Sequence, residues 1–281
     1  MSAAALWPQR AQAGAGMAAI RPPAVAGTFY PADAGRLRAT VEEYVGAAPG
    51  SAGGRAPKAL IAPHAGYVYS GPVAGRAFAA LGPGAAQIRR IVVIGPAHFV
   101  PLRGLARPTA AAFRTPLGEV PLDGAALAGL HDLPQVAARD APHAPEHGIE
   151  VELPFLQSLI GGFALVPLVV GEATPEQVAD VLERLWGGPE TLLVISSDLS
   201  HYEAYARAGE HDAATALAIE RLDGAALGAA DACGWLAIAG LLRAARRRGL
   251  AARRLDLRNS GDTAGSRDAV VGYGAWAFDE T

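Results

Sequence analysis

Residues 91–98 read IVVIGPAH: four consecutive apolar residues, all β-branched, followed by a short turn that ends in a histidine. Similar runs occur at residues 59–64 (ALIAPH), 164–171 (ALVPLVVG) and 192–198 (LLVISSD). Continuous apolar runs of this length are typical of strands that are buried on both faces of a sheet. A further apolar run, which begins at residue 269 and continues to Phe278, predicts a last strand.

Alanine- and leucine-rich stretches with helical character alternate with these strands. They lie at residues 35–44, 72–81, 124–130, 175–186, 204–221 and 231–248. Thr174 and Pro175 form a good helix start, with a hydroxyl N-cap and proline at the first helical position. Residues 113–123 predict an antiparallel strand or hairpin outside this alternation. The pattern predicts a three-layer α/β/α sandwich around a mostly parallel or mixed sheet.

The length of 281 residues, 51% of them hydrophobic, supplies enough apolar mass for one large core or two small ones. No stretch is long or polar enough to act as a linker between domains, and no period of about 20–50 residues repeats. We therefore expect residues 21–281 to form a single domain. Residues 1–20, which are rich in alanine and glycine, are expected to be a disordered tail.

Net charge, cysteine content and hydropathy argue against several classes of protein. A net charge of -3 and a pI near 6.2 provide no basic footprint for nucleic acid. The basic run at residues 246–248 is expected to be a solvated helix face. A single cysteine excludes an internal disulfide. No apolar segment reaches the roughly 18 residues needed to span a bilayer, and no signal-peptide pattern opens the chain. These features predict a cytoplasmic protein without a nucleic-acid or membrane partner.

Two of the predicted strands end in a turn that carries a histidine. His64 follows residues 59–62, and His98 follows residues 91–94. Ligands of open α/β sheets bind at the carboxyl ends of the strands, so these two side chains are expected to converge. Each histidine alone is more commonly a hydrogen-bonded structural residue. Because imidazole is the commonest metal ligand, the repeated arrangement favours a metal site.

A third strand ends in residues 196–202, SSDLSHY, which place a carboxylate and an imidazole three residues apart. Asp198 and His201 could belong to the same site. The alternative is a helix cap, in which Asp198 or Ser200 caps the following helix and His201 lies in its first turn. The two interpretations do not exclude each other.

Two further positions are candidates. His147 and Glu150 are spaced i,i+3, one face of a helix, but the alternative is a first-turn charge pattern favoured by the helix dipole. The second histidine of a zincin motif is missing. Cys233 precedes a largely apolar helix; it is either an inert buried residue or a thiolate that completes a His2Cys ligand set. His131, His143 and His211 have no comparable setting and are expected to be surface or structural residues.

The sequence also lacks the motifs of several enzyme classes. There is no G-x-x-x-x-G-K-[ST] loop, and the Gly-x-Gly pairs lack the context of a dinucleotide fingerprint. No G-x-S-x-G elbow accompanies the Asp, His and Ser residues near position 200, so a hydrolase triad is unsupported.

The chain resembles the Memo family, called AmmeMemoRadiSam system protein B in prokaryotes. The matching blocks span residues 21–278 in order, nearly the whole chain. They lie at residues 21–31, 63–71, 95–98, 115–119, 146–156, 196–202, 232–234 and 270–273.

The resemblance implies a fold similar to class III extradiol dioxygenases of the LigB type, which are non-haem iron enzymes. Two histidine iron ligands of those enzymes match His64 and His98, and their acid–base histidine matches His201. A cysteine, here Cys233, replaces their carboxylate ligand. Thiolate is softer than carboxylate, which favours copper(I) or a different iron state; zinc would also suit a His2Cys set. The replacement puts ring cleavage in doubt.

Three hypotheses follow. In the first, the protein is a metal-dependent oxidoreductase that binds iron(II) or copper(I) through His64, His98 and Cys233. His201, assisted by Asp198, would move a proton, and His147 and Tyr67 would line the substrate pocket. In the second, the protein is a non-catalytic adaptor that holds a small molecule, a peptide or a partner of AMMECR or radical-SAM type. In the third, zinc on His64, His98 and Asp198 assists hydrolysis.

Overall fold

The computed structural model describes residues 19–48 and 54–280. The predicted tail, residues 1–20, lies almost entirely outside them. The main sheet contains β2 (Ala59–Ala62), β3 (Arg90–Pro96), β4 (Leu105–Arg107), β7 (Val136–Ala138), β8 (Ala164–Val170), β9 (Thr191–Ser196), β10 (His201–Glu203), β11 (Leu250–Asn259) and β12 (Val270–Glu280). A small sheet contains β1 (Ile20–Arg21), β5 (Ala112–Thr115) and β6 (Gly118–Pro121).

The centre of the main sheet is parallel and its edges are mixed. The strand order is β10-β12-β2-β9-β3-β8-β4-β7, with β11 paired to β12. The neighbours β2, β9, β3 and β8 run parallel. β12 is antiparallel to both β2 and β11. The four apolar runs of the sequence therefore form the interior of one mixed sheet, as predicted.

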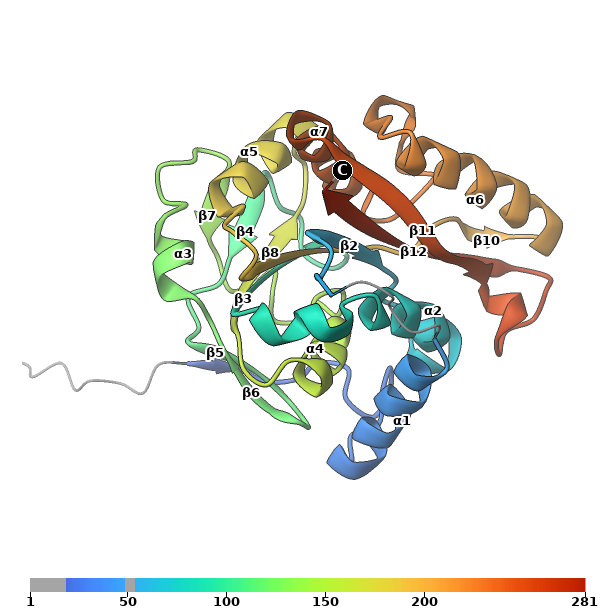
Figure 1. The fold of residues 1–281 in the computed structure, drawn as a ribbon, viewed down its shortest axis with the longest axis horizontal. Helices are drawn as coiled ribbons and strands as arrows, with labels where there is room; N and C mark the ends of the chain where they lie inside the picture. The colour runs from blue at the N-terminus through green and yellow to red at the C-terminus, as the bar shows by residue number, and fades with distance from the viewer. Residues whose placement is uncertain (1–18, 49–53, 281) are drawn as a thin grey trace, which may run out of the picture.

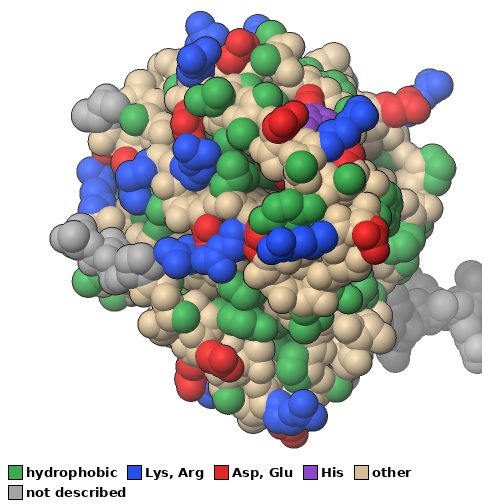
Figure 2. Space-filling model, turned by 90° about the vertical axis from the view of Figure 1, so that its right-hand side faces the viewer, with side chains coloured by type: hydrophobic (Ala, Val, Ile, Leu, Met, Phe, Trp, Pro, Cys, Tyr) green, Lys and Arg blue, Asp and Glu red, His purple; other side chains and the backbone are tan. Residues whose placement is uncertain are grey.

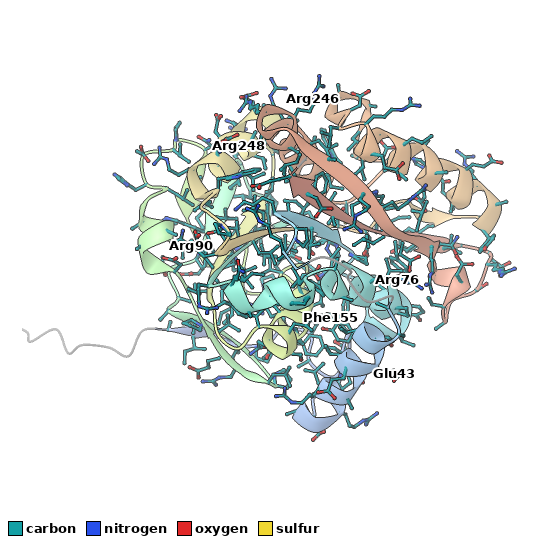
Figure 3. The ribbon with its side chains drawn as sticks, viewed as in Figure 1. Glu43, Arg76, Arg90, Phe155, Arg246 and Arg248 are labelled. Atoms are coloured by element: carbon teal, nitrogen blue, oxygen red, sulfur yellow. The ribbon has the colours of Figure 1, made fainter. Side chains whose placement is uncertain are left out.

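Helices cover both faces of this sheet. Figure 1 shows α1 (Ala34–Gly46), α2 (Tyr67–Ala79) and α4 (Leu153–Leu159) on one side, and α5 (Pro175–Leu185), α6 (Tyr205–Glu220) and α7 (Trp235–Arg248) on the other. Each face has its own core of buried side chains. In Figure 3, Phe155 projects from α4 inside the lower layer, where its ring stacks on Phe78. The three-layer α/β/α prediction is confirmed.

The remaining short elements connect these layers. They are α3 (Gly124–Ala128) and four 3-10 turns, η1 (Gly82–Gln87), η2 (Glu150–Glu152), η3 (Gly224–Ala226) and η4 (Ser260–Asp262). The predicted hairpin at residues 113–123 is present as the antiparallel pair β5 and β6.

Two helix starts differ from the sequence prediction. α2 begins at Tyr67, five residues before the predicted start, so Pro72 lies inside the helix. α7 begins at Trp235, four residues after the predicted start at residue 231. Asp231 lies in the preceding turn, where it accepts the backbone N–H of Gly228 and pairs with His211. The short strands β4, β7 and β10, the long strand β11 and helix α4 were not predicted.

The basic run at residues 246–248 forms the exposed end of α7, as predicted. Figure 3 shows Arg246 and Arg248 at the outer surface of that helix. Arg248 pairs with Glu183 of α5 and lies over the ring of Trp186. The run therefore joins two helices of the upper layer and remains solvated.

Charged side chains of both signs are interspersed with hydrophobic ones on the face drawn in Figure 2. Within residues 19–48 and 54–280, none of the helices combines the length and apolar character that crossing a bilayer requires.

Candidate metal centre

The histidines that follow β2 and β3 meet at the carboxyl edge of the sheet. The ring centroids of His64 and His98 lie 5.1 Å apart. A third ring, that of His147, stacks on His98 at 4.6 Å and lies 5.4 Å from His64. One ring nitrogen from each histidine lies within 4.8 Å of the others. The predicted convergence of His64 and His98 is present, and His147 joins them as a third donor.

Hydrogen bonds fix the orientation of two of these rings. His98 Nδ1 lies 2.8 Å from Glu146 Oε1, and His64 Nδ1 lies 2.8 Å from Ser196 Oγ. Glu146 also accepts the backbone N–H groups of His98, His147 and Gly148. Outer partners of this kind hold metal-binding imidazoles in one tautomer, with the opposite nitrogen free for the ion.

The local environment favours the neutral form of two of these imidazoles, His64 and His147, and a neutral imidazole is the form that binds metal. Burial and the neighbouring His98 lower the pKa of His64 to about 3. Burial and the nearby His64 lower the pKa of His147 to about 4. Burial raises the pKa of Glu146, but its hydrogen bonds with the His98 ring and with the backbone N–H groups of Gly148 and His98 outweigh burial and hold the value at about 2. Ionised Glu146 therefore accepts the ring hydrogen bond of His98, beside the neutral rings of His64 and His147.

Cys233 lies beside this group. Its Sγ is 3.2 Å from His64 Nε2 and accepts the backbone N–H of Asp198 at 3.3 Å. Burial and the charge of Asp198 raise the pKa of the thiol to about 12. The structure thus brings Cys233 to His64, while the metal-compatible group of the described residues consists of His64, His98 and His147.

Asp198 and His201 differ in burial and in their hydrogen-bond partners. Asp198 is buried, and its Oδ1 accepts the backbone N–H of His64 at 2.8 Å. His201 is exposed, its Nδ1 donates to the Leu199 carbonyl at 2.7 Å, and its Nε2 has no hydrogen-bond partner among the described residues. Since residues 201–203 form β10 and α6 starts after Ala204, the helix-cap alternative is wrong.

Tyr67 and Glu150 are engaged elsewhere. The Tyr67 hydroxyl donates to the Val151 carbonyl at 2.7 Å, and the ring is buried against Phe155. Glu150 lies in the first turn of η2, as the first-turn alternative expected, but it is fully buried and pairs with Arg21. Glu150 also accepts from the Tyr30 hydroxyl.

Sequence reasoning missed the two residues that orient the rings. Glu146 immediately precedes His147, and Ser196 ends a buried strand, so both lie within the blocks that match the Memo family, at residues 146–156 and 196–202. Nothing in the sequence shows that their partners are His98 and His64, which are 48 and 132 residues away.

The donor set suits a borderline metal ion. Two nitrogens that share one tetrahedral ion at about 2.1 Å each are about 3.4 Å apart. The nitrogens of the group lie within 4.8 Å of one another, so a shift of at most about 1.5 Å brings any pair to that spacing. Imidazole suits iron, copper, nickel and zinc, and a nearby thiol adds preference for soft ions. The three residues could hold a metal ion.

Fold and site together define an α/β protein with a histidine centre at the strand ends. A family model described as Memo-like protein matches residues 21–277. A relative named MEMO1 family protein from Aeropyrum pernix is 38% identical, and the match covers 91% of this chain and 98% of the relative. Another of the same name, from Ignicoccus hospitalis, is 36% identical, with 92% of this chain and 98% of the relative covered. A third, from Thermotoga neapolitana, is 34% identical over 90% and 98%. The chain belongs to the Memo-like family.

Proposed function

We propose that this protein is a metal-binding redox protein that acts as a metal-dependent oxidoreductase. Its ion is iron(II) or copper(I), with zinc as the redox-inert rival. The supporting observation is the group of three ring nitrogens, from His64, His98 and His147, within 4.8 Å of one another. Iron or copper, when bound, would supply one-electron chemistry.

Each side chain then has a distinct task. His64, His98 and His147 bind the ion, and Cys233 lies close enough to His64 to join them. His201 presents a free Nε2 on the exposed side, where it can take a proton from a substrate or return one. Asp198 holds the backbone of His64, so its role is positioning.

An anaerobic titration with iron(II), copper(I) and zinc tests this function. We expect His64→Ala and His98→Ala each to weaken binding by at least about 10-fold, because each removes a ligand whose orientation the fold has fixed. His131→Ala is the matched control, since His131 is exposed and its Nδ1 contacts only the Ala128 carbonyl in its own turn. Unchanged affinity in both ligand variants would refute the metal site.

Cys233→Ser separates the ions from one another. A thiolate prefers soft copper(I), so this variant should lose more affinity for copper(I) than for zinc. Equal losses for both ions would show that Cys233 is not a ligand. Oxygen consumption by the iron-loaded or copper-loaded wild type, absent from the His201→Ala variant, would support the redox activity.

A second candidate function is binding of a peptide or a partner protein at the same edge. Four large hydrophobic side chains are exposed there or just beside it: Val68 (58%), Tyr69 (40%), Phe99 (56%) and Tyr202 (77%). Phe99 contacts the ring of His147, and Tyr202 contacts that of His201. The partner could be of the AMMECR or radical-SAM type. Retained partner binding by metal-free protein, without oxygen consumption by the loaded form, would favour this function.

A further inference from the structure

Two glutamates two positions apart are both fully buried, yet their surroundings differ completely. Glu150 accepts from four donors: the Arg21 guanidinium, the Tyr30 hydroxyl and the backbone N–H groups of Ala24 and Val25. The carboxyl oxygens of Glu150 therefore face only donors, one of them cationic.

Glu152 has none of these partners. Its Oε1 lies 2.7 Å from Ser196 Oγ, and its Oε2 is buried without a hydrogen-bond partner among the described residues. No ion pair with Glu152 occurs within residues 19–48 and 54–280. An ionised carboxylate in this position would be an uncompensated buried charge, which costs several kcal/mol.

The contacts of Ser196 determine where the protons lie. Its Oγ contacts three groups: the Gly148 carbonyl, Glu152 Oε1 and His64 Nδ1. A hydroxyl has one hydrogen, and the Gly148 carbonyl can only accept, so that hydrogen is directed to Gly148. The contacts with Glu152 and His64 then require hydrogens from those two partners. Both conditions are met when Glu152 is protonated and His64 carries its proton on Nδ1.

We propose that Glu152 is a neutral carboxylic acid that donates to Ser196 and, through this serine, fixes His64 as the Nδ1–H tautomer. The Nε2 lone pair of His64 is then directed to the side where Cys233 lies, at 3.2 Å. Glu152 is thus a positioning residue. Its effect on metal binding rests on the proposed function, whereas its protonation does not.

The electrostatics of the interior agree with this assignment. Burial raises the pKa of Glu152 well above its usual value, and the charge of Asp198 adds to the shift, against the hydrogen bond to Ser196. Neutral Glu152 also removes a negative charge from beside Tyr67, which is itself fully buried.

Infrared difference spectroscopy of the full-length, metal-free protein at pH 7 tests the protonation. The wild-type minus Glu152→Gln spectrum should contain the carbonyl stretch of a protonated carboxylic acid. The wild-type minus Glu119→Gln spectrum, from an exposed glutamate paired with Arg114, should contain only carboxylate bands. Carboxylate bands in the Glu152 spectrum would overturn the proposal. Carboxyl ¹³C shifts of labelled wild-type protein give the same answer without a variant.

Zinc affinity tests the positioning role. Ser196→Ala and Glu152→Leu should each weaken zinc binding about 10-fold or more, and Glu152→Gln, which keeps an N–H donor, should restore most of the loss. Histidine ¹⁵N spectra should show Nδ1–H at His64 in wild type and a mixed tautomer in Ser196→Ala. Unchanged tautomer and affinity in Ser196→Ala would refute the positioning role. Loss of the proposed function would instead appear as unchanged zinc affinity in His64→Ala.

Discussion

At the scale of single residues, one carboxylate organises much of the centre. Glu146 accepts four N–H groups, including the ring Nδ1 of His98, and is almost fully buried. Gly148 comes so close that a Cβ there would lie 3.3 Å from His64 Nδ1 and 3.4 Å from Glu146 Oε1. The centre is therefore built as much by its supporting groups as by its donors.

Glu146→Gln should weaken metal binding by about 10- to 100-fold, because the amide puts an N–H₂ in place of one of the two oxygens that accept these four donors and removes the negative charge. Isothermal titration with zinc measures the loss. Glu119→Gln, on the exposed hairpin, serves as the control and should bind like wild type. Wild-type affinity in Glu146→Gln would show that the orientation of His98 does not depend on this carboxylate.

His143 makes stability depend on pH. Its Nε2 donates to the Ala106 carbonyl, its Nδ1 is buried without a partner among the described residues, and burial lowers its pKa to about 4. The unfolded chain binds this proton near pH 6.5. The stabilisation is therefore complete above pH 6.5 and is lost as the pH falls toward 4, by about 2 kcal/mol at pH 5.

Urea unfolding at pH 7.5 and pH 5 measures this loss. His143→Gln keeps a donor for the Ala106 carbonyl but cannot take up a proton, so the difference between the two pH values should shrink. An identical pH dependence in wild type and variant would exclude His143 as the source.

At the scale of elements, strands with a continuous apolar run can be predicted from the sequence, whereas strands and side chains whose place depends on distant partners cannot. The continuous apolar runs identify β2, β3, β8 and β9 because a strand buried on both faces has few polar positions. β11 (LAARRLDLRN) has neither a continuous apolar run nor a regular alternation, and it pairs in the sheet with β12, a partner that local pattern does not specify. Likewise His64, His98 and Cys233 stood out as donors, whereas Glu146 and Ser196 became visible only through contacts across the chain.

The start of α5 was predicted from Thr174 and is a complete capping box, in which Thr174 and Gln177 satisfy each other's backbone N–H groups. Thr174→Ala should lower the free energy of unfolding by about 1 kcal/mol. Thr40→Ala, inside α1, removes a hydroxyl that does not cap a helix and should change stability less. Equal losses in urea unfolding would argue against the cap.

At the scale of the whole molecule, the centre joins segments that are distant in sequence. The donors follow β2 and β3 and precede η2, and Cys233 lies just before α7. A metal ion that binds only the folded chain stabilises it by about 2.7 kcal/mol at a free concentration of 100 times Kd. Zinc should therefore raise the melting temperature of wild type by several degrees, and a chelator should reverse the shift. The same shift in His98→Ala would mean that zinc acts elsewhere.

The position of β12 has a consequence for how the chain is made. Among the described strands it comes last in the chain and so is made after the others, yet it lies inside the sheet, between β2 and β11. Until β12 emerges, one edge of β2 has unpaired backbone N–H and C=O groups. Such an edge can pair with another chain and aggregate unless a chaperone binds it. β2 therefore gains its second neighbour only after every other described strand has been made.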